Sequence, residues 1–103
     1  SIMIGYRQHL RVVGDSMEGT ISEGDLIIYK KTNRKHLDLN IGDIVVASHP
    51  KIKNKLIIKR IYQIHQNKLD LRGDNFLSST DSREWGLIEL DLIVGKVQQV
   101  FTK

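Results

Sequence analysis

The sequence predicts a mostly β protein. Short apolar segments alternate with turn-forming residues along the chain, which is typical of strands joined by tight turns. Three Gly-Asp pairs, at 24–25, 42–43 and 73–74, lie at the edges of these segments, and both residue types favour turns. Helical periodicity is nearly absent. We therefore expect one compact β domain over residues 1–103, with at most short helical turns.

The expected elements follow from these apolar segments and the turns that bound them. In chain order the strands are His9–Val13, Asp25–Lys31, Asp43–His49, Lys55–His65, Lys68–Arg72 and Ile93–Phe101. The second and third strands each begin at a Gly-Asp pair. One helical turn is expected after Ser16 and another over Leu87–Leu92. The polar stretch from Gly73 to Gly86 is expected to form a loop, and a loop of this length in a small domain is usually functional or tightly packed.

Composition excludes several classes of protein. The chain has no cysteine, which excludes a disulfide scaffold, a thiolate nucleophile and a Cys-ligated metal. The longest apolar runs, at 26–29 and 44–47, are far shorter than the roughly 20 residues that a membrane-spanning helix needs. No N-terminal stretch has the pattern of a signal peptide. The four histidines, at positions 9, 36, 49 and 65, show no metal-ligand spacing, so we expect neither a metal nor a cofactor.

The net charge is +4, from 16 Lys and Arg against 12 Asp and Glu. The excess is local, in the segment 30–36 and at Lys51, Lys53 and Lys55. Such a patch can meet nucleic acid or an anionic membrane surface. We favour solvated loops and expect no nucleic-acid partner, because no aromatic or glycine-rich recognition pattern interleaves with the lysines.

Ser16 stands where an expected strand ends in Gly14 and a polar turn. A nucleophilic serine needs an exposed hydroxyl at a tight turn and nearby backbone N–H groups to hold an oxyanion. On local sequence alone, a plain turn in which Ser16 or Asp15 caps a short helix is the favoured interpretation.

Lys59 shares one face of its expected strand with Ile57 and Ile61, because side chains alternate along a strand. An ammonium among aliphatic neighbours has a lowered pKa, and a neutral lysine is a competent general base for a serine hydroxyl. The alternative is an edge-strand lysine whose head reaches water.

Taken together, four segments resemble the signal peptidase I-like (S26) clan of Ser-Lys proteases in order and spacing, over roughly residues 12 to 97. Residues 14–21 (GDSMEGTI) resemble the nucleophile box, and residues 58–61 (IKRI) resemble the general-base box. The Gly-Asp turns at 24–25 and 42–43 resemble structural turns of the clan. Residues 73–75 (GDN) with 79–86 (STDSREWG) resemble its C-terminal box.

This resemblance implies a single Ser-Lys protease catalytic domain with the compact β-barrel-type core of signal peptidases and LexA-like repressors. It implies that Ser16 is the nucleophile, that Lys59 is the general base and that Ser79 orients the lysine. The Ser16 backbone N–H would serve the oxyanion hole, while Gly14 replaces a serine donor that some relatives have. Further implied roles are an ion pair of Asp81 with Arg83, loop shaping by Asp74 and Asn75, and a substrate pocket lined by Met17.

Two departures from the clan stand out. Gly19 occupies a position where relatives usually have proline, which leaves the turn after the nucleophile less rigid. Only residues 61–72 lie between Arg60 and Gly73, so the long insertion of larger bacterial signal peptidases is missing.

The implied function is a serine endopeptidase that removes an N-terminal leader from a precursor. The compact length, residues 46–50 and the STDSR segment look most like the nickel-type superoxide dismutase maturation protease branch, which implies that dismutase precursor as the partner. Met3 would then be the natural start, residues 1–2 a cloning remnant, and the location cytoplasmic.

Two alternatives remain. The chain could be the catalytic domain of a membrane-anchored type I signal peptidase that faces the extracytoplasmic side. It could instead be a regulatory domain, either a basic nucleic-acid-binding module or a self-cleaving repressor. Ala47, the sole alanine, is followed by Ser48, so the Ala-Gly bond that such repressors cut is missing.

Overall fold

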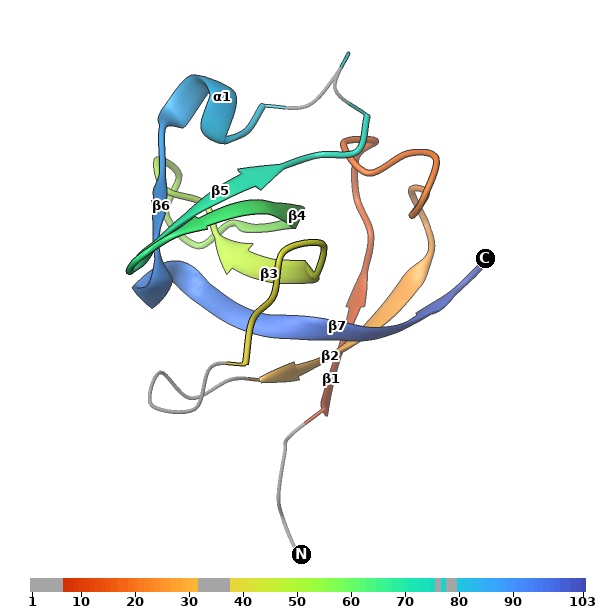
Figure 1. Ribbon diagram of the computed structural model, residues 1–103. Coiled ribbons are helices and arrows are strands. Elements are labelled where there is room, and N and C mark those ends of the chain that lie inside the picture. Colours follow the sequence, from red (N-terminus) through yellow and green to blue (C-terminus); the bar gives the residue numbers. More distant parts are fainter. Residues whose placement is uncertain (1–6, 32–37, 76, 78–79) are drawn as a thin grey trace, which may run out of the picture.

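The computed structural model describes residues 7–31, 38–75, 77 and 80–103. Seven strands form one antiparallel sheet that curls on itself (Figure 1). They are β1 (Arg7–Arg11), β2 (Leu26–Lys31), β3 (Ile44–Ser48), β4 (Leu56–His65), β5 (Lys68–Arg72), β6 (Ile88–Glu89) and β7 (Ile93–Phe101). A single turn of α-helix, α1 (Ser82–Trp85), and a 3₁₀ turn, η2 (Leu90–Leu92), complete the described elements. The predicted mostly β fold with short helical turns is confirmed.

The predicted strands are recovered with small shifts at their ends. The first strand is the exception, because it covers Arg7–Arg11 rather than His9–Val13. Val12 still pairs with the chain opposite, where its N–H donates to the Asp25 carbonyl at 2.8 Å. The segment after Ser16, where one helical turn was expected, has no assigned helix: residues 16–20 form hydrogen-bonded turns, and the Ile21 N–H donates to the Met17 carbonyl at 2.8 Å. The turn expected over Leu87–Leu92 is helical only at Leu90–Leu92.

The C-terminal strand lies inside the sheet, whose order is β1-β2-β7-β3-β4-β5-β6. Strand β7 pairs antiparallel with both β2 and β3, and each pairing contains a register shift. Gly95 allows the close approach of β7 to β2. A Cβ at Gly95 would lie 2.6 Å from the Lys30 carbonyl oxygen and from Cδ2 of Tyr29, so a side chain would clash there.

Strand β3 separates two apolar clusters, because its successive side chains point to opposite faces. Val45 and Ala47 pack in one cluster and Val46 in the other, and all three are fully buried. The first cluster also contains Ile61, Leu69, Leu71, Ile88 and Ile93. The second contains Val12, Met17, Ile21, Ile27 and Tyr29. The second cluster therefore fixes the segment around Ser16 against the sheet.

No helix in the described part of the chain has the length and apolar character needed to cross a bilayer.

Candidate active site

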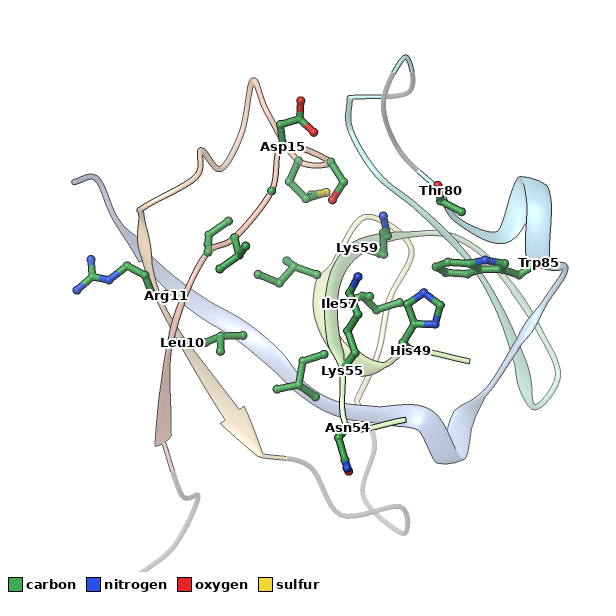
Figure 2. Close-up of a pocket in the computed structure, with 17 residues that line it drawn as sticks. Leu10, Arg11, Asp15, His49, Asn54, Lys55, Ile57, Lys59, Thr80 and Trp85 are labelled. Atoms are coloured by element: carbon green, nitrogen blue, oxygen red, sulfur yellow. The ribbon is translucent and has the colours of Figure 1, made fainter. Parts of the chain in front are cut away.

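A pocket of about 620 Å³ opens between the turn after β1 and the hairpin of β3 and β4 (Figure 2). Its walls come from segments that are far apart in the sequence. The lining residues are Leu10 to Met17, His49, Asn54 to Lys59, Thr80 and Trp85. Ser16 and Lys59 therefore line the same pocket, and aliphatic side chains of both segments lie beside them, among them Val12, Ile57 and Ile58.

Ser16 lies half-buried in the turns that follow β1. Gly14 has a φ of +89°, a left-handed conformation that allows the chain to bend just before the serine. The Ser16 carbonyl accepts a hydrogen bond from the backbone N–H of Asn75 at 2.8 Å. Among the described residues, the Ser16 N–H has no acceptor, so it is available to a ligand in the pocket.

Lys59 lies in β4, opposite Val45 of β3, and only 4% of its surface is exposed. Ile57 and Ile61 flank it on the same face of the strand. Burial lowers the pKa of Lys59 below its ordinary value; the negative charge of Asp81 raises it, and the positive charges of Arg83 and Lys55 lower it further. The net direction favours a neutral amine in the pocket wall.

Met17 is buried beneath the pocket and connects the serine turn to the segment after β5. It is 2% exposed, and its Sδ accepts a hydrogen bond from the Asp74 N–H at 3.3 Å. The Asn75 side chain adds a second connection, since its Nδ2 donates to the Asp15 carbonyl at 3.0 Å. The turn that holds Ser16 is thus fixed by residues 74 and 75.

Asp74 also connects to the strand that carries Lys59. Its carboxylate accepts two hydrogen bonds from the Arg60 guanidinium, from Nε at 2.9 Å and from Nη2 at 2.8 Å, and a third from the Thr20 hydroxyl. The hydrogen bonds from Arg60 hold the pKa of Asp74 below its ordinary value, and the Thr20 hydroxyl lowers it further. Because Arg60 follows Lys59, this ion pair joins the two sides of the site.

Asp81 organises the segment beside the pocket that the sequence predicted as a loop. It caps α1 by accepting from the Arg83 N–H at 3.1 Å, and it also accepts from the Gly73 N–H at 3.0 Å. Its carboxylate is 1% exposed and forms an ion pair with Arg83 at 2.6 Å. The hydroxyl of Ser82 accepts from the Leu71 N–H at 2.9 Å, which attaches the helical turn to β5.

Several residues that line the pocket were not predicted as site residues from the sequence, among them His49, Lys55 and Trp85. The His49 and Trp85 rings lie with their centroids 4.7 Å apart. Alternation along β3 could have found His49, because it shares the face of Val45 and Ala47. Ser79, expected beside the lysine, lies outside the described residues, although its neighbour Thr80 lines the pocket. Across the described ranges, no three His, Cys, Asp or Glu side chains gather as metal ligands.

Comparison with known proteins identifies a peptidase-type domain. The chain belongs to the Peptidase S24-like family, whose model matches residues 7–86.

Curated relatives of this chain are subunits of mitochondrial proteases. The mitochondrial inner membrane protease subunit 1 of Mus musculus and that of Homo sapiens are each 31% identical over 104 residues. The mitochondrial ATP-independent inner membrane protease subunit 1a of Arabidopsis thaliana is 27% identical over 108 residues. Each match covers 82% of this chain, but only 63% of the two mammalian proteins and 64% of the plant protein.

Proposed function

We propose that this chain is the catalytic domain of a serine endopeptidase that removes an N-terminal leader from a precursor protein. Ser16 is the proposed nucleophile and Lys59 the proposed general base. The observation that carries the proposal is that both residues line one pocket although they lie far apart in the sequence. Membership of a peptidase family and the protease relatives support a polypeptide substrate.

The burial of Lys59 supports its role as the base. A serine hydroxyl attacks a peptide carbonyl readily only when a base accepts its proton, and a neutral amine has the lone pair to do so. In the first step, Oγ of Ser16 bonds to the carbonyl carbon while its proton moves to Nζ of Lys59. The negative charge forms on the carbonyl oxygen, and the backbone N–H of Ser16 is the proposed donor to it.

The remaining steps return the protein to its starting state. The C–N bond breaks as Lys59 donates its proton to the leaving amine, which leaves an ester on Ser16. A water molecule attacks this ester and gives its proton to Lys59. The ester C–O bond then breaks, the acid product leaves, and the Ser16 oxygen recovers a proton from the lysine.

Supporting roles are proposed for the residues around this pair. Met17 would line the subsite for the residue before the cleaved bond, which its position in the pocket wall supports. Asp81 with Arg83, and Asp74 with Asn75, would hold the surrounding segments in place, which their hydrogen bonds support. Ser79 would orient the Lys59 amine, a role that rests on the family resemblance alone.

The substrate proposed for the first test is the precursor of nickel-type superoxide dismutase, on the resemblance of residues 46–50 and of the STDSR segment. The names of the relatives favour a second candidate, an exported or membrane-associated precursor, because these proteins are called inner membrane proteases. A cytoplasmic location stays a prediction, which fractionating cells and detecting the chain in each fraction would check.

The decisive experiment incubates the purified chain with each of the two precursors and identifies new N-termini by mass spectrometry. Ser16→Ala and Lys59→Ala should each abolish cleavage while circular dichroism shows a folded protein. Ser22→Ala and Lys68→Ala are matched controls, because neither residue lines the pocket. Full activity in either pocket variant would disprove the proposed mechanism. Cleavage of only one precursor would identify the substrate class.

A further inference from the structure

His49 has one ring nitrogen fully occupied by the backbone of the hairpin that follows β3. Its Nδ1 accepts hydrogen bonds from the N–H groups of Lys51 and Ile52, each at 3.0 Å. A ring nitrogen that accepts hydrogen bonds carries no proton, so the proton of the neutral ring lies on Nε2. Since the two nitrogens point in different directions from the ring, the Nε2–H points away from this hairpin turn.

The surroundings of the imidazole also disfavour its protonated form. Burial lowers the pKa of His49 below its ordinary value, and the positive charges of Lys55 and Lys59 lower it further. Protonation would in addition place a hydrogen on Nδ1 and break both bonds to the hairpin backbone. The ring is therefore a neutral donor whose tautomer is fixed by its surroundings.

The same ring forms part of the pocket wall. His49 lies beside Trp85, with ring planes inclined by 59°, on the side of the pocket where Lys59 lies (Figure 2). The backbone N–H of His49 donates to the Lys55 carbonyl at 2.8 Å, which fixes the backbone beneath the ring. Within the described part of the chain, Nε2 has no hydrogen-bond acceptor. A fixed donor in a pocket wall that also contains aliphatic and aromatic side chains is the kind of group that orients a ligand.

We propose that His49 is a specificity-determining residue whose Nε2–H donates a hydrogen bond to an uncharged carbonyl oxygen of the peptide substrate. This inference rests on the proposed function. The carbonyl belongs to the substrate backbone or to an amide side chain near the cleaved bond. A neutral donor suits this group because it provides a direction without placing a cation beside the Lys59 amine.

Two substitutions test the roles of the two ring nitrogens separately. In His49→Asn, the amide oxygen occupies the region of Nδ1 and still accepts from the hairpin backbone, but nothing replaces the Nε2–H. In His49→Gln, the longer side chain returns an N–H donor to the region of Nε2. If the pocket donor matters, the Gln variant keeps substrate binding and the Asn variant loses it. If the ring serves only the hairpin turn, the Asn variant is the better replacement.

The test measures binding without cleavage. Each substitution is made in the Ser16→Ala chain, which is immobilised and exposed to a peptide library from a digested proteome. Retained peptides are quantified by mass spectrometry. We expect His49→Asn to lower retention about tenfold, the effect of one lost hydrogen bond, and His49→Gln to stay within about threefold. His65→Asn and His65→Gln are controls, because this exposed histidine at the end of β4 does not line the pocket.

Every outcome decides the inference. The inference is overturned if the Asn variant retains as much peptide as the Gln variant, or more. It is also overturned if the Ser16→Ala chain with His49 intact retains no peptide. A second outcome separates the inference from the proposed function. If the Gln variant retains more peptide than the Asn variant, but the chain with Ser16 in place cleaves none of these peptides, the proposed function is refuted and the inference about His49 stands. For peptides that are cleaved, the Asn variant should raise KM with kcat and the pH profile unchanged, which a merely structural defect would not produce.

Discussion

Arg60 and Asp74 form a bidentate ion pair, with Nε of Arg60 2.9 Å from Oδ1 of Asp74 and Nη2 of Arg60 2.8 Å from Oδ2. Arg60 stands next to Lys59 in β4, and Asp74 also accepts from Thr20 in the turns around Ser16. One carboxylate therefore connects the strand of the proposed base to the segment of the proposed nucleophile. The distance between these two functional groups depends on this connection.

Replacing Asp74 by Asn should weaken both the fold and the catalysis. The amide keeps the size of the side chain but loses the charge-assisted hydrogen bonds. Because the pair is partly exposed, at 36% for Arg60 and 22% for Asp74, we expect a loss of about 1 kcal/mol in the free energy of unfolding. We also expect a lower kcat/KM. Urea unfolding and cleavage assays check this, with Asp70→Asn as the control for a carboxylate that pairs with Arg72 away from the pocket.

The same pair predicts a pH dependence of stability. Its hydrogen bonds hold the folded-state pKa of Asp74 below the ordinary value of about 3.9. The stabilisation is therefore fully present above that value and is lost as the pH falls through the depressed pKa. The free energy of unfolding, measured from pH 6 to pH 2, should fall less steeply for Asp74→Asn than for the unmodified chain. Parallel curves would contradict the assignment.

Replacing Lys59 by Met should abolish cleavage and increase stability. Met has a similar volume and removes the cost of burying an ammonium, so we expect a gain of about 1 kcal/mol at neutral pH. Because the pKa of Lys59 is lowered in the folded state, the unfolded chain binds more protons between that pKa and about 10.4. Over this interval the unmodified chain should gain stability as the pH rises, and the Met variant should not. Thermal unfolding across alkaline pH measures the difference.

Replacing Arg83 by Gln should move the pH–activity profile. Activity should rise with pH as Lys59 loses its proton, with a midpoint below the ordinary lysine pKa. Arg83 lowers that pKa directly and also neutralises Asp81, whose charge raises it. The Gln variant should therefore shift the midpoint of kcat/KM towards alkaline pH. Lys68→Gln, at an exposed pair with Glu89, should leave the midpoint unchanged. An unchanged midpoint in both variants would argue against Lys59 as the base.

Introducing a proline at position 19, as the resemblance to the signal peptidase I-like clan implies for that position, should harm this chain. Gly19 has a φ of +99°, whereas a proline ring fixes φ near −65°. We expect Gly19→Pro to cost about 3 kcal/mol or to displace the turn that carries Ser16. Gly19→Ala should cost about 1 kcal/mol for the backbone alone, since its Cβ would meet nothing within 4 Å. Unfolding free energies of the two variants provide the comparison, and equal values would contradict it.

Most of the sheet could be predicted from the sequence because strands have a strong local signature. Alternation and the Gly-Asp turns gave β2 to β5 and β7 to within about one residue at each end. Alternation also predicted the shared face of Ile57, Lys59 and Ile61, of which Lys59 and Ile61 are buried. The helical turn at Ser82–Trp85 was missed because four residues are too few to show a helical period. The cap at Asp81, with Glu84 three residues later, was the available signal.

The meeting of Ser16 and Lys59 in one pocket could not be predicted from periodicity. Ser16 follows β1 and Lys59 lies in β4, and three strands separate these two in the order of the sheet. Only the curl of the sheet brings the two segments to one pocket, and curvature is not encoded in the alternation of either strand. The family resemblance supplied that pairing. It gave no indication of the contact between His49 and Trp85, which depends on how α1 packs near the end of β3.

The interior position of β7 has a consequence for biosynthesis. A ribosome makes residues 93–101 after the described strands β1 to β6, yet these residues join β2 to β3. Nascent chains that stop short of this segment hold two unconnected pieces of sheet, and the opening between them has no fixed shape. The pocket that Ser16 and Lys59 line therefore takes its final shape only after residues 93–101 have been made.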